Sequence, residues 1–319
     1  MNKKNRLPSL VFFGTPLFAS HCLESLLDAN FKILSVVTAP DRKAGRGKKL
    51  TSSSVKQLAE SFELPIFQPI NLKESKFISQ LTELKADIFV VVAFRMLPKV
   101  VWSLPKFGSI NLHASLLPNY RGAAPINWVL INGEKKTGIT TFFIDEKIDS
   151  GSILLQKEVS IDLNDNAGSL HDKLVYQGAP LIIDTLKGIQ SGTLNSRKQN
   201  ITKSKFEAPK LSAKNTKLEW GATLIMLKNK IKGLCPYPGA WSFFENNGIQ
   251  GRLKILKAET IYEKHSHPLN KILVKGDEIY ITNREGYLNC IEIQLPNKKR
   301  MSSKTLLNGY KFDSNARVL

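Results

Sequence analysis

Residues 87–113 read DIFVVVAFRMLPKVVWSLPKFGSINLH, and two apolar runs within this stretch decide the fold. The first run, Asp87–Ala93, is a nearly continuous series of β-branched and aromatic residues, and the second is Ile110–His113. Strands that are apolar on both faces are typical of a parallel sheet covered by helices on both sides. The stretch therefore predicts two strands of such a sheet.

The chain before this stretch alternates between strand-like and helical segments in the same way. Strands are predicted at Leu10–Phe13, Ile33–Val37 and Ile66–Gln68, and helices at Phe18–Leu27 and Ser54–Phe62. Further strands are predicted at Thr140–Ile144 and Ser152–Glu158, followed by a helix at Ser169–Lys187 that Gly188 is placed to end. The predicted fold class is α/β, with a Rossmann-like, mainly parallel sheet and flanking helices. The first turn has a single glycine, Gly14, instead of G-x-G-x-x-G, which argues against a dinucleotide cofactor.

The C-terminal third has a different pattern. We expect a first domain over residues 1–200, a polar, lysine-rich linker over 201–217 and a second domain over 218–319. Beyond the linker an amphipathic helix is predicted at Ala222–Gly233. Short strand-like runs then recur at close spacing, which predicts a small OB-like β-barrel. Three aromatic residues of this part are expected to pack in its core or at a hinge: Trp220, Tyr237 and Trp241.

The chain is strongly basic. It has 46 Lys and Arg against 27 Asp and Glu, a formal net charge of +19. Residues 201–319 carry +11 of this charge and residues 1–200 the other +8, so the C-terminal part is the more basic per residue. Such an excess favours a polyanionic partner. The alternative is a surface of solvated lysines with no such role.

Cysteine usage and hydropathy indicate the compartment. Cys22, Cys235 and Cys290 are widely spaced and form neither a disulfide framework nor a metal motif. The apolar run near the N-terminus is short and broken by Gly14 and Pro16, and no run approaches the length of a membrane span. We therefore expect a cytoplasmic protein without a bound metal.

Three polar residues are the candidate catalytic groups. Asn111 and His113 are two apart at the end of a predicted strand, so their side chains project from the same face. Asp149 follows 36 residues after the histidine. An amide and a protonated imidazole can stabilise the oxyanion formed when an acyl group passes to an amine. A nearby carboxylate can manage the proton that the amine releases. Taken singly, a histidine at the end of a strand is usually structural, and an Asp-Ser-Gly triplet is usually a turn.

Several motifs extend over nearly the whole chain: VFFGTPLFA (11–19), TAPDRKAGRGKKL (38–50), LPIFQP (64–69), INLHASLLPNYRGAAPI (110–126), IDSG (148–151) and LCPYPGAW (234–241). The central motif alone is similar to folate-dependent formyltransferases in general. With the basic segment and LCPYPGAW, the chain resembles the methionyl-tRNA formyltransferase family.

The resemblance implies a two-domain enzyme that moves a formyl group from 10-formyltetrahydrofolate to the α-amine of methionine on initiator tRNA. The family's catalytic residues fall on Asn111, His113 and Asp149. Its folate-contacting loop falls on Ser115, Leu116, Leu117 and Pro118. Two leucines and free backbone groups in this loop suit a flat pterin ring with polar edges. The resemblance also makes the C-terminal barrel a tRNA-binding domain.

The segment Pro40–Leu50 is a candidate tRNA contact. Its basic residues Arg42, Arg46, Lys48 and Lys49 suit a loop that crosses a phosphate backbone. By resemblance the loop enters the acceptor-stem end of the tRNA, where Arg46 helps to separate the first base pair. Without the family resemblance, an ordinary solvated basic loop explains this segment equally well.

Two segments depart from the family pattern. AFRMLP (93–98), with Arg95, replaces a glycine-containing stretch that borders the folate pocket, and IDEKIDSG carries extra charge before Asp149. We expect a monomer that transfers the formyl group directly, with no covalent enzyme intermediate. Two alternatives stay open. One is a related formyltransferase that acts on a small amine, and the other is a catalytically idle RNA-binding protein on the same scaffold.

Overall fold

The computed structural model describes residues 6–44, 49–200, 202 and 204–319. The chain divides into two compact units. The first consists of Met1–Gly122, Lys136–Ser160 and His171–Glu207, and the second of Ala123–Lys135, Ile161–Leu170 and Ala208–Leu319. None of the described helices combines the length and apolar character needed to span a bilayer.

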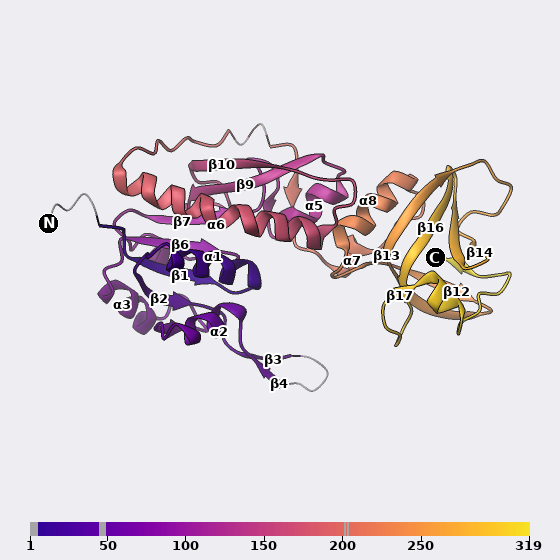
Figure 1. Ribbon diagram of the computed structural model, residues 1–319, viewed down its shortest axis with the longest axis horizontal. Coiled ribbons are helices and arrows are strands. Elements are labelled where there is room, and N and C mark those ends of the chain that lie inside the picture. Colours follow the sequence, from indigo (N-terminus) through magenta and orange to yellow (C-terminus); the bar gives the residue numbers. More distant parts are fainter. Residues whose placement is uncertain (1–5, 45–48, 201, 203) are drawn as a thin grey trace. The chain divides into compact units, whose positions relative to one another are not determined.

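A mixed sheet forms the centre of the first unit, as Figure 1 shows. Its strand order is β10-β9-β7-β6-β1-β2-β5. The five strands β5, β2, β1, β6 and β7 are parallel to one another. Strand β9 is antiparallel to both of its neighbours, β7 and β10. The bounds of these strands are β1 (Leu10–Gly14), β2 (Ile33–Val37), β5 (Ile66–Phe67), β6 (Ile88–Val92), β7 (Ser109–His113), β9 (Lys136–Phe143) and β10 (Ile153–Ser160). The predicted mainly parallel α/β sheet is confirmed.

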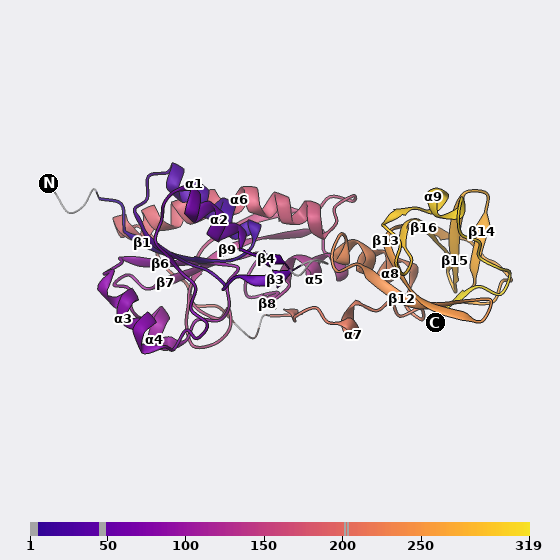
Figure 2. The same cartoon turned by 90° about the horizontal axis from the view of Figure 1, so that it is seen from below.

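Helices cover both faces of this sheet, because its central strands are apolar on both sides. Figure 2 shows α1 (Leu17–Asp28) and α6 (Ala167–Ser191) over one face and α3 (Ser75–Glu83) and α4 (Lys99–Trp102) over the other. Alternate residues of β1 and β6, such as Val11 and Phe89, form a buried cluster with side chains of α3 and α4. The helix α2 (Ser54–Ser61) packs beside α1.

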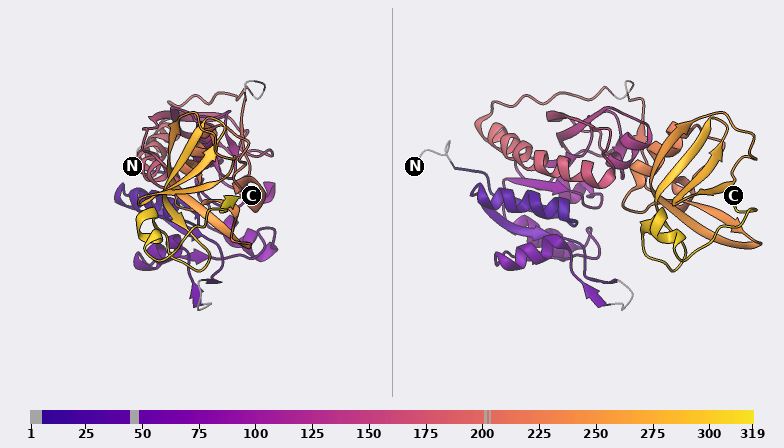
Figure 3. Two further views of the ribbon diagram at one scale, coloured as in Figure 1. Left: turned by 90° about the vertical axis from the view of Figure 1, so that its right-hand side faces the viewer. Right: turned by 45° about the vertical axis from the view of Figure 1, so that its right-hand side comes forward.

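Antiparallel strands of the second unit form a nearly closed barrel, visible in orange to yellow in Figure 3. The order is β14-β15-β16-β13-β12-β18, with β17 on β16. Backbone hydrogen bonds between residues 270–272 and 316–318 join the two ends of this order. The bounds are β12 (Ala240–Asn246), β13 (Ile249–Tyr262), β14 (Ile272–Lys275), β15 (Glu278–Asn283), β16 (Gly286–Gln294), β17 (Met301–Ser302) and β18 (Arg317–Val318). The predicted small β-barrel is confirmed.

The core of the barrel unit includes α8 (Leu224–Leu234), whose apolar face packs against β13 and β16. Trp220 and Trp241 are buried as predicted. Tyr237 is 82% exposed, so of its two predicted positions, core or hinge, the core position is wrong. It lies between Pro236 and Pro238 in the turn that joins α8 to β12.

The end of α6 was also predicted wrongly. The helix begins at Ala167, continues past Pro180 and Gly188, and ends only at Ser191. Leu194 packs on Gly188, where an added Cβ would lie 2.3 Å from the leucine Cδ1. Gly188 is therefore a packing glycine, and Gly192, with φ +67°, is the left-handed residue that follows the helix.

The remaining elements are short. They are β3 (Arg42–Ala44), β4 (Lys49–Thr51), β8 (Arg121–Gly122), α5 (Pro125–Ile131), β11 (Glu207–Ala208), α7 (Ala213–Thr216) and α9 (Ser303–Leu307).

Candidate active site

Strand β7 directs two of the three candidate side chains to one face of the sheet. Leu112 points toward α6, because a Cβ added at Gly178 of that helix would lie 2.8 Å from its Cδ2. Successive residues of a strand alternate between faces. Asn111 and His113 therefore lie on the opposite face, and the edge of the His113 ring packs on Phe142 of β9, with ring centroids 6.5 Å apart.

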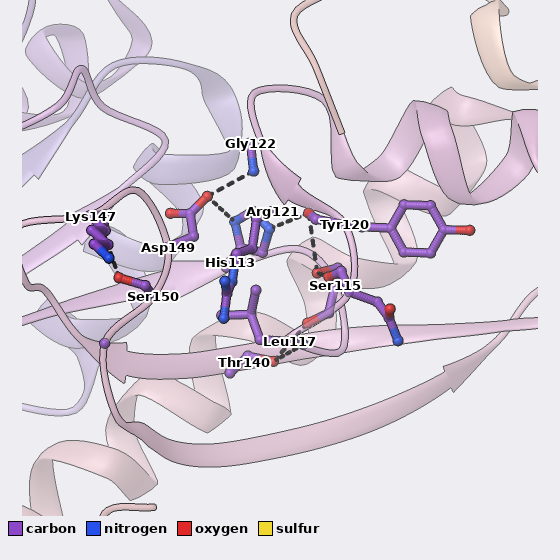
Figure 4. Close-up of polar contacts among 12 residues, drawn as sticks. His113, Ser115, Leu117, Tyr120, Arg121, Gly122, Thr140, Lys147, Asp149 and Ser150 are labelled. Carbon is purple, nitrogen blue, oxygen red and sulfur yellow. Dashed lines mark hydrogen bonds and ion pairs between the residues drawn. The ribbon is translucent and has the colours of Figure 1, made fainter. Parts of the chain in front are cut away.

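The two nitrogens of His113 have different partners (Figure 4). Nε2 lies 2.8 Å from the backbone oxygen of Tyr120 and must donate to it, since a carbonyl only accepts. Nδ1 lies 3.7 Å from Oδ2 of Asp149. The imidazole is 6% exposed, so its orientation is fixed by these groups rather than by solvent. The carbonyl selects the Nε2–H form and leaves Nδ1 to face the carboxylate.

Asp149 is held by backbone groups. Its Oδ2 accepts a hydrogen bond of 2.9 Å from the Gly122 amide. Its own backbone has φ +50°, a left-handed conformation that costs a non-glycine residue about 1–2 kcal/mol. In the same loop, Ser150 Oγ donates its one hydrogen to Asp145 Oδ1 at 2.6 Å and lies 3.0 Å from the Lys147 backbone oxygen. These contacts place the carboxylate beside the imidazole although the two residues come from separate segments.

Asn111 is half-buried in the middle of β7. Within the described residues, its side-chain amide makes no hydrogen bond to the protein. An amide on the same face as the imidazole, and free of internal partners, is available as a hydrogen-bond donor to a bound molecule.

The loop Ser115–Pro118 is tied down more firmly than expected. Thr140 Oγ1 donates to the Ser115 backbone oxygen at 2.7 Å, and Gln156 Nε2 donates to that of Leu117 at 2.9 Å. Leu117 is 3% exposed and packs on Phe142. The expectation of free backbone groups is wrong at these positions, because backbone polar groups buried in a loop must be paired. Leu116 is the half-buried leucine of the loop, and Pro118 is also half-buried.

The described parts of the basic segment, Arg42–Ala44 and Lys49–Thr51, form the two antiparallel strands β3 and β4 of a hairpin. Arg42 begins β3 and is exposed. Arg46 and Lys48 lie outside the described residues, and so does the side chain of Lys49. At the base of the hairpin, Asp41 accepts hydrogen bonds from Lys56 and Gln68, and these bonds, the one from Lys56 above all, lower the pKa of its carboxyl.

Arg95, the residue that departs from the family pattern, binds the neighbouring backbone. Its guanidinium donates to the backbone oxygens of Pro69 and Ile70. Burial lowers the pKa of this side chain, and repulsion from Arg42 adds to the effect. Arg95 thus fixes the 93–98 segment to the end of β5.

Sequence reasoning missed the groups that orient the candidate residues. The Tyr120 carbonyl and the Gly122 amide both lie in the motif at 110–126. They act through backbone atoms, so the types of their side chains do not reveal these contacts. Thr140 and Gln156 lie on strands that the sequence predicted. The pattern of those strands did not indicate that the two side chains would hold the Ser115–Pro118 loop. Among the described residues, no cluster of three His, Cys, Asp or Glu could hold a metal ion.

Two family models match the chain: "Formyl transferase" over residues 8–186 and "Formyl transferase, C-terminal domain" over residues 210–311. Methionyl-tRNA formyltransferase of Flavobacterium johnsoniae is 45% identical over 309 residues, which cover 97% of this chain and 98% of that protein. The chain belongs to the methionyl-tRNA formyltransferase family. It is an enzyme, a folate-dependent formyltransferase that acts on methionyl-tRNA in translation initiation.

Further relatives agree with this assignment. The methionyl-tRNA formyltransferase of Bacteroides thetaiotaomicron is 41% identical over 308 residues, with 95% of this chain and 96% of that protein covered. A solved N-formyltransferase from Helicobacter canadensis superposes with a TM-score of 0.63 at 23% identity, covering 88% of this chain and 97% of that one. At that level of identity, the likeness shows the fold alone.

Proposed function

We propose that this enzyme transfers the formyl group of 10-formyltetrahydrofolate directly to the α-amino group of methionyl initiator tRNA, at Asn111, His113 and Asp149. The observation that carries the proposal is the His113 ring, held at Nε2 by a carbonyl and facing the Asp149 carboxylate at 3.7 Å through Nδ1. The reaction runs in the cytoplasm, where initiator tRNA is charged, and the enzyme acts as a monomer.

The amine nitrogen attacks the formyl carbon, and the carbonyl π-bond moves onto oxygen to give a tetrahedral oxyanion. The Asn111 amide and the protonated Nδ1 of His113 donate to that oxygen. Because 3.7 Å exceeds a hydrogen bond, the Nδ1 proton is not committed to Asp149 and is available to a third oxygen. Donors fixed before the reaction stabilise the developing charge without reorganising.

Asp149 has two roles in this scheme. Its negative charge lies 3.7 Å from Nδ1 and offsets the positive charge of the ring that donates to the oxyanion. The amine nitrogen becomes positively charged when it attacks, and Asp149 accepts the proton that this nitrogen then loses, directly or through one water. The intermediate then collapses, the bond from carbon to N10 breaks, and N10 takes up the proton that Asp149 accepted, which returns Asp149 to its carboxylate form. The products are formylmethionyl-tRNA and tetrahydrofolate.

The other predicted contacts complete the proposal. The Ser115–Pro118 loop lies beside the catalytic strand, and the half-buried Leu116 and Pro118 offer apolar surface to the pterin. The basic segment with Arg42, Arg46, Lys48 and Lys49 contacts the acceptor end of the tRNA, and the barrel unit contacts the rest of the stem through phosphates.

The test is a single-turnover measurement of formyl transfer with Asn111→Ala and His113→Gln enzymes. Each variant should lose about 100- to 1,000-fold in rate, because each removes one donor to the oxyanion. The dissociation constant for the folate, measured on the same preparations, should change less than about threefold. Equal losses in rate and in folate affinity would assign these residues to binding instead, and unchanged rates would remove them from the site.

A further inference from the structure

Gln199 contacts the Asp149 loop although it lies in the polar segment that follows α6. Its Nε2 donates to the backbone oxygens of Asp149 at 3.0 Å and Gly151 at 2.8 Å. Its Oε1 accepts from Nε of Arg121 at 3.2 Å and from the same guanidinium through a second nitrogen. Only one orientation of the amide satisfies all these partners, because carbonyls accept and guanidinium groups donate.

These contacts connect the two segments that place the carboxylate. Arg121 is followed by Gly122, whose amide donates to Asp149 Oδ2. Gln199 therefore links the backbone of Asp149 to Arg121, and Arg121 is next to Gly122, whose amide holds the Asp149 side chain. Gln199 is itself fixed, because Arg197 pairs with Ile153 of β10 through two backbone hydrogen bonds of 2.8 and 2.9 Å.

The Asp149 backbone needs such support. A non-glycine residue at φ +50° persists only where surrounding contacts hold it. Loss of the two hydrogen bonds from Gln199 would let the loop relax and would move the carboxylate from its place 3.7 Å from His113 Nδ1. Displacement of a catalytic group by about 1 Å can cost about 100-fold in rate.

We propose that Gln199, oriented by Arg121, is a positioning residue for this reaction and acts through Asp149. The inference rests on the proposed role of Asp149. It assigns a function to a residue that touches neither the folate nor the methionyl group in the proposed scheme.

The test is a double-mutant cycle in single-turnover formylation. Gln199→Glu keeps the acceptor for Arg121 but loses both donors to the loop. In the wild-type background it should lower the transfer rate about 10- to 100-fold with little change in KM for either substrate. In an Asp149→Asn background it should lower the remaining rate less than about twofold, because the carboxylate on which it acts is already gone.

Gln190→Glu is the matched control. Gln190 is also half-buried and also donates to a backbone oxygen, that of Arg6, but it lies on α6 away from the loop. Its rate should stay within about twofold of wild type. If Gln199→Glu fails to fold, Arg121→Met, which removes the other side of the contact, should show the same dependence on Asp149.

The outcomes separate the two proposals. If Asp149→Asn has the wild-type rate, the proposed function of Asp149 is wrong. If Asp149→Asn is slow but Gln199→Glu is as fast as wild type, or is slowed equally in both backgrounds, Asp149 keeps its role and the positioning role of Gln199 is wrong.

Discussion

At the scale of single residues, the candidate site depends on the His113 ring, whose two nitrogens have different partners. The Tyr120 carbonyl occupies Nε2 of His113, so every other partner must use Nδ1. Asn111 and His113 could be chosen from the sequence because spacing on a strand fixes which face a side chain occupies. The tautomer of His113 could not be predicted from the sequence, because it depends on the backbone oxygen of Tyr120, seven residues away. The direction of that oxygen is set by the turn.

The three cysteines are a second residue-scale feature, and they bear on direct transfer. Burial raises the pKa of Cys22 and of Cys290 to about 12, and burial also raises the pKa of Cys235. A thiol with a pKa near 12 is about one part in ten thousand thiolate at pH 8, and the thiolate is the nucleophile. A formyl group carried on a cysteine is therefore disfavoured.

Iodoacetamide at pH 8 should consequently leave the formylation rate of the native enzyme unchanged over an hour. Mass spectrometry of the treated protein should show little alkylation before denaturation and alkylation of all three cysteines after it. A loss of activity that follows the alkylation of any one cysteine would contradict direct transfer.

At the scale of elements, the main strands and the helices α1, α2, α6 and α8 followed from apolar periodicity, whereas α3, α5 and the loops did not. Ile33–Val37 was predicted with its observed bounds, because both faces of that strand are apolar. The hydrogen bonds from Gln199 to the Asp149 loop join residues 50 and 48 apart in a polar segment without a repeating pattern. Such contacts depend on the complete sheet, so the sequence alone contains no local signal for them.

Gly151 shows how tightly β9 and β10 hold this loop. A Cβ added there would lie 1.7 Å from the backbone oxygen of Phe143, which cannot give way without moving β9. Gly151→Ala should lower the free energy of unfolding by about 1–3 kcal/mol and should also lower kcat, because the loop carries Asp149. Denaturant unfolding and steady-state kinetics would measure both.

Gly221→Ala is the control, since an added Cβ meets nothing within 4 Å there and the φ of that residue is not left-handed. Its stability and rate should match the wild type. If Gly151→Ala behaves like this control, the loop is less constrained than its contacts indicate.

At the scale of the whole molecule, the chain joins an α/β unit of general formyltransferase type to a basic unit containing a β-barrel. The fold class of each part followed from the spacing of its strands. The compact unit that contains the barrel also includes residues 123–135 and 161–170. Membership in a unit depends on packing between distant segments, which periodicity does not report.

The basic charge bears on the choice of acceptor. The net charge of +11 on residues 201–319 has no evident use for a small amine but suits the phosphates of a tRNA. We therefore expect the RNA to be part of the recognised substrate, and the proposed catalytic groups to act on an amine that the RNA places correctly.

The most direct measurement compares kcat/KM for charged initiator tRNA with that for glycinamide ribonucleotide, using 10-formyltetrahydrofolate and the purified enzyme. We predict formylmethionyl-tRNA as the product and a preference for the tRNA of at least about a hundredfold. Equal use of the small amine, or no transfer to the tRNA, would contradict it.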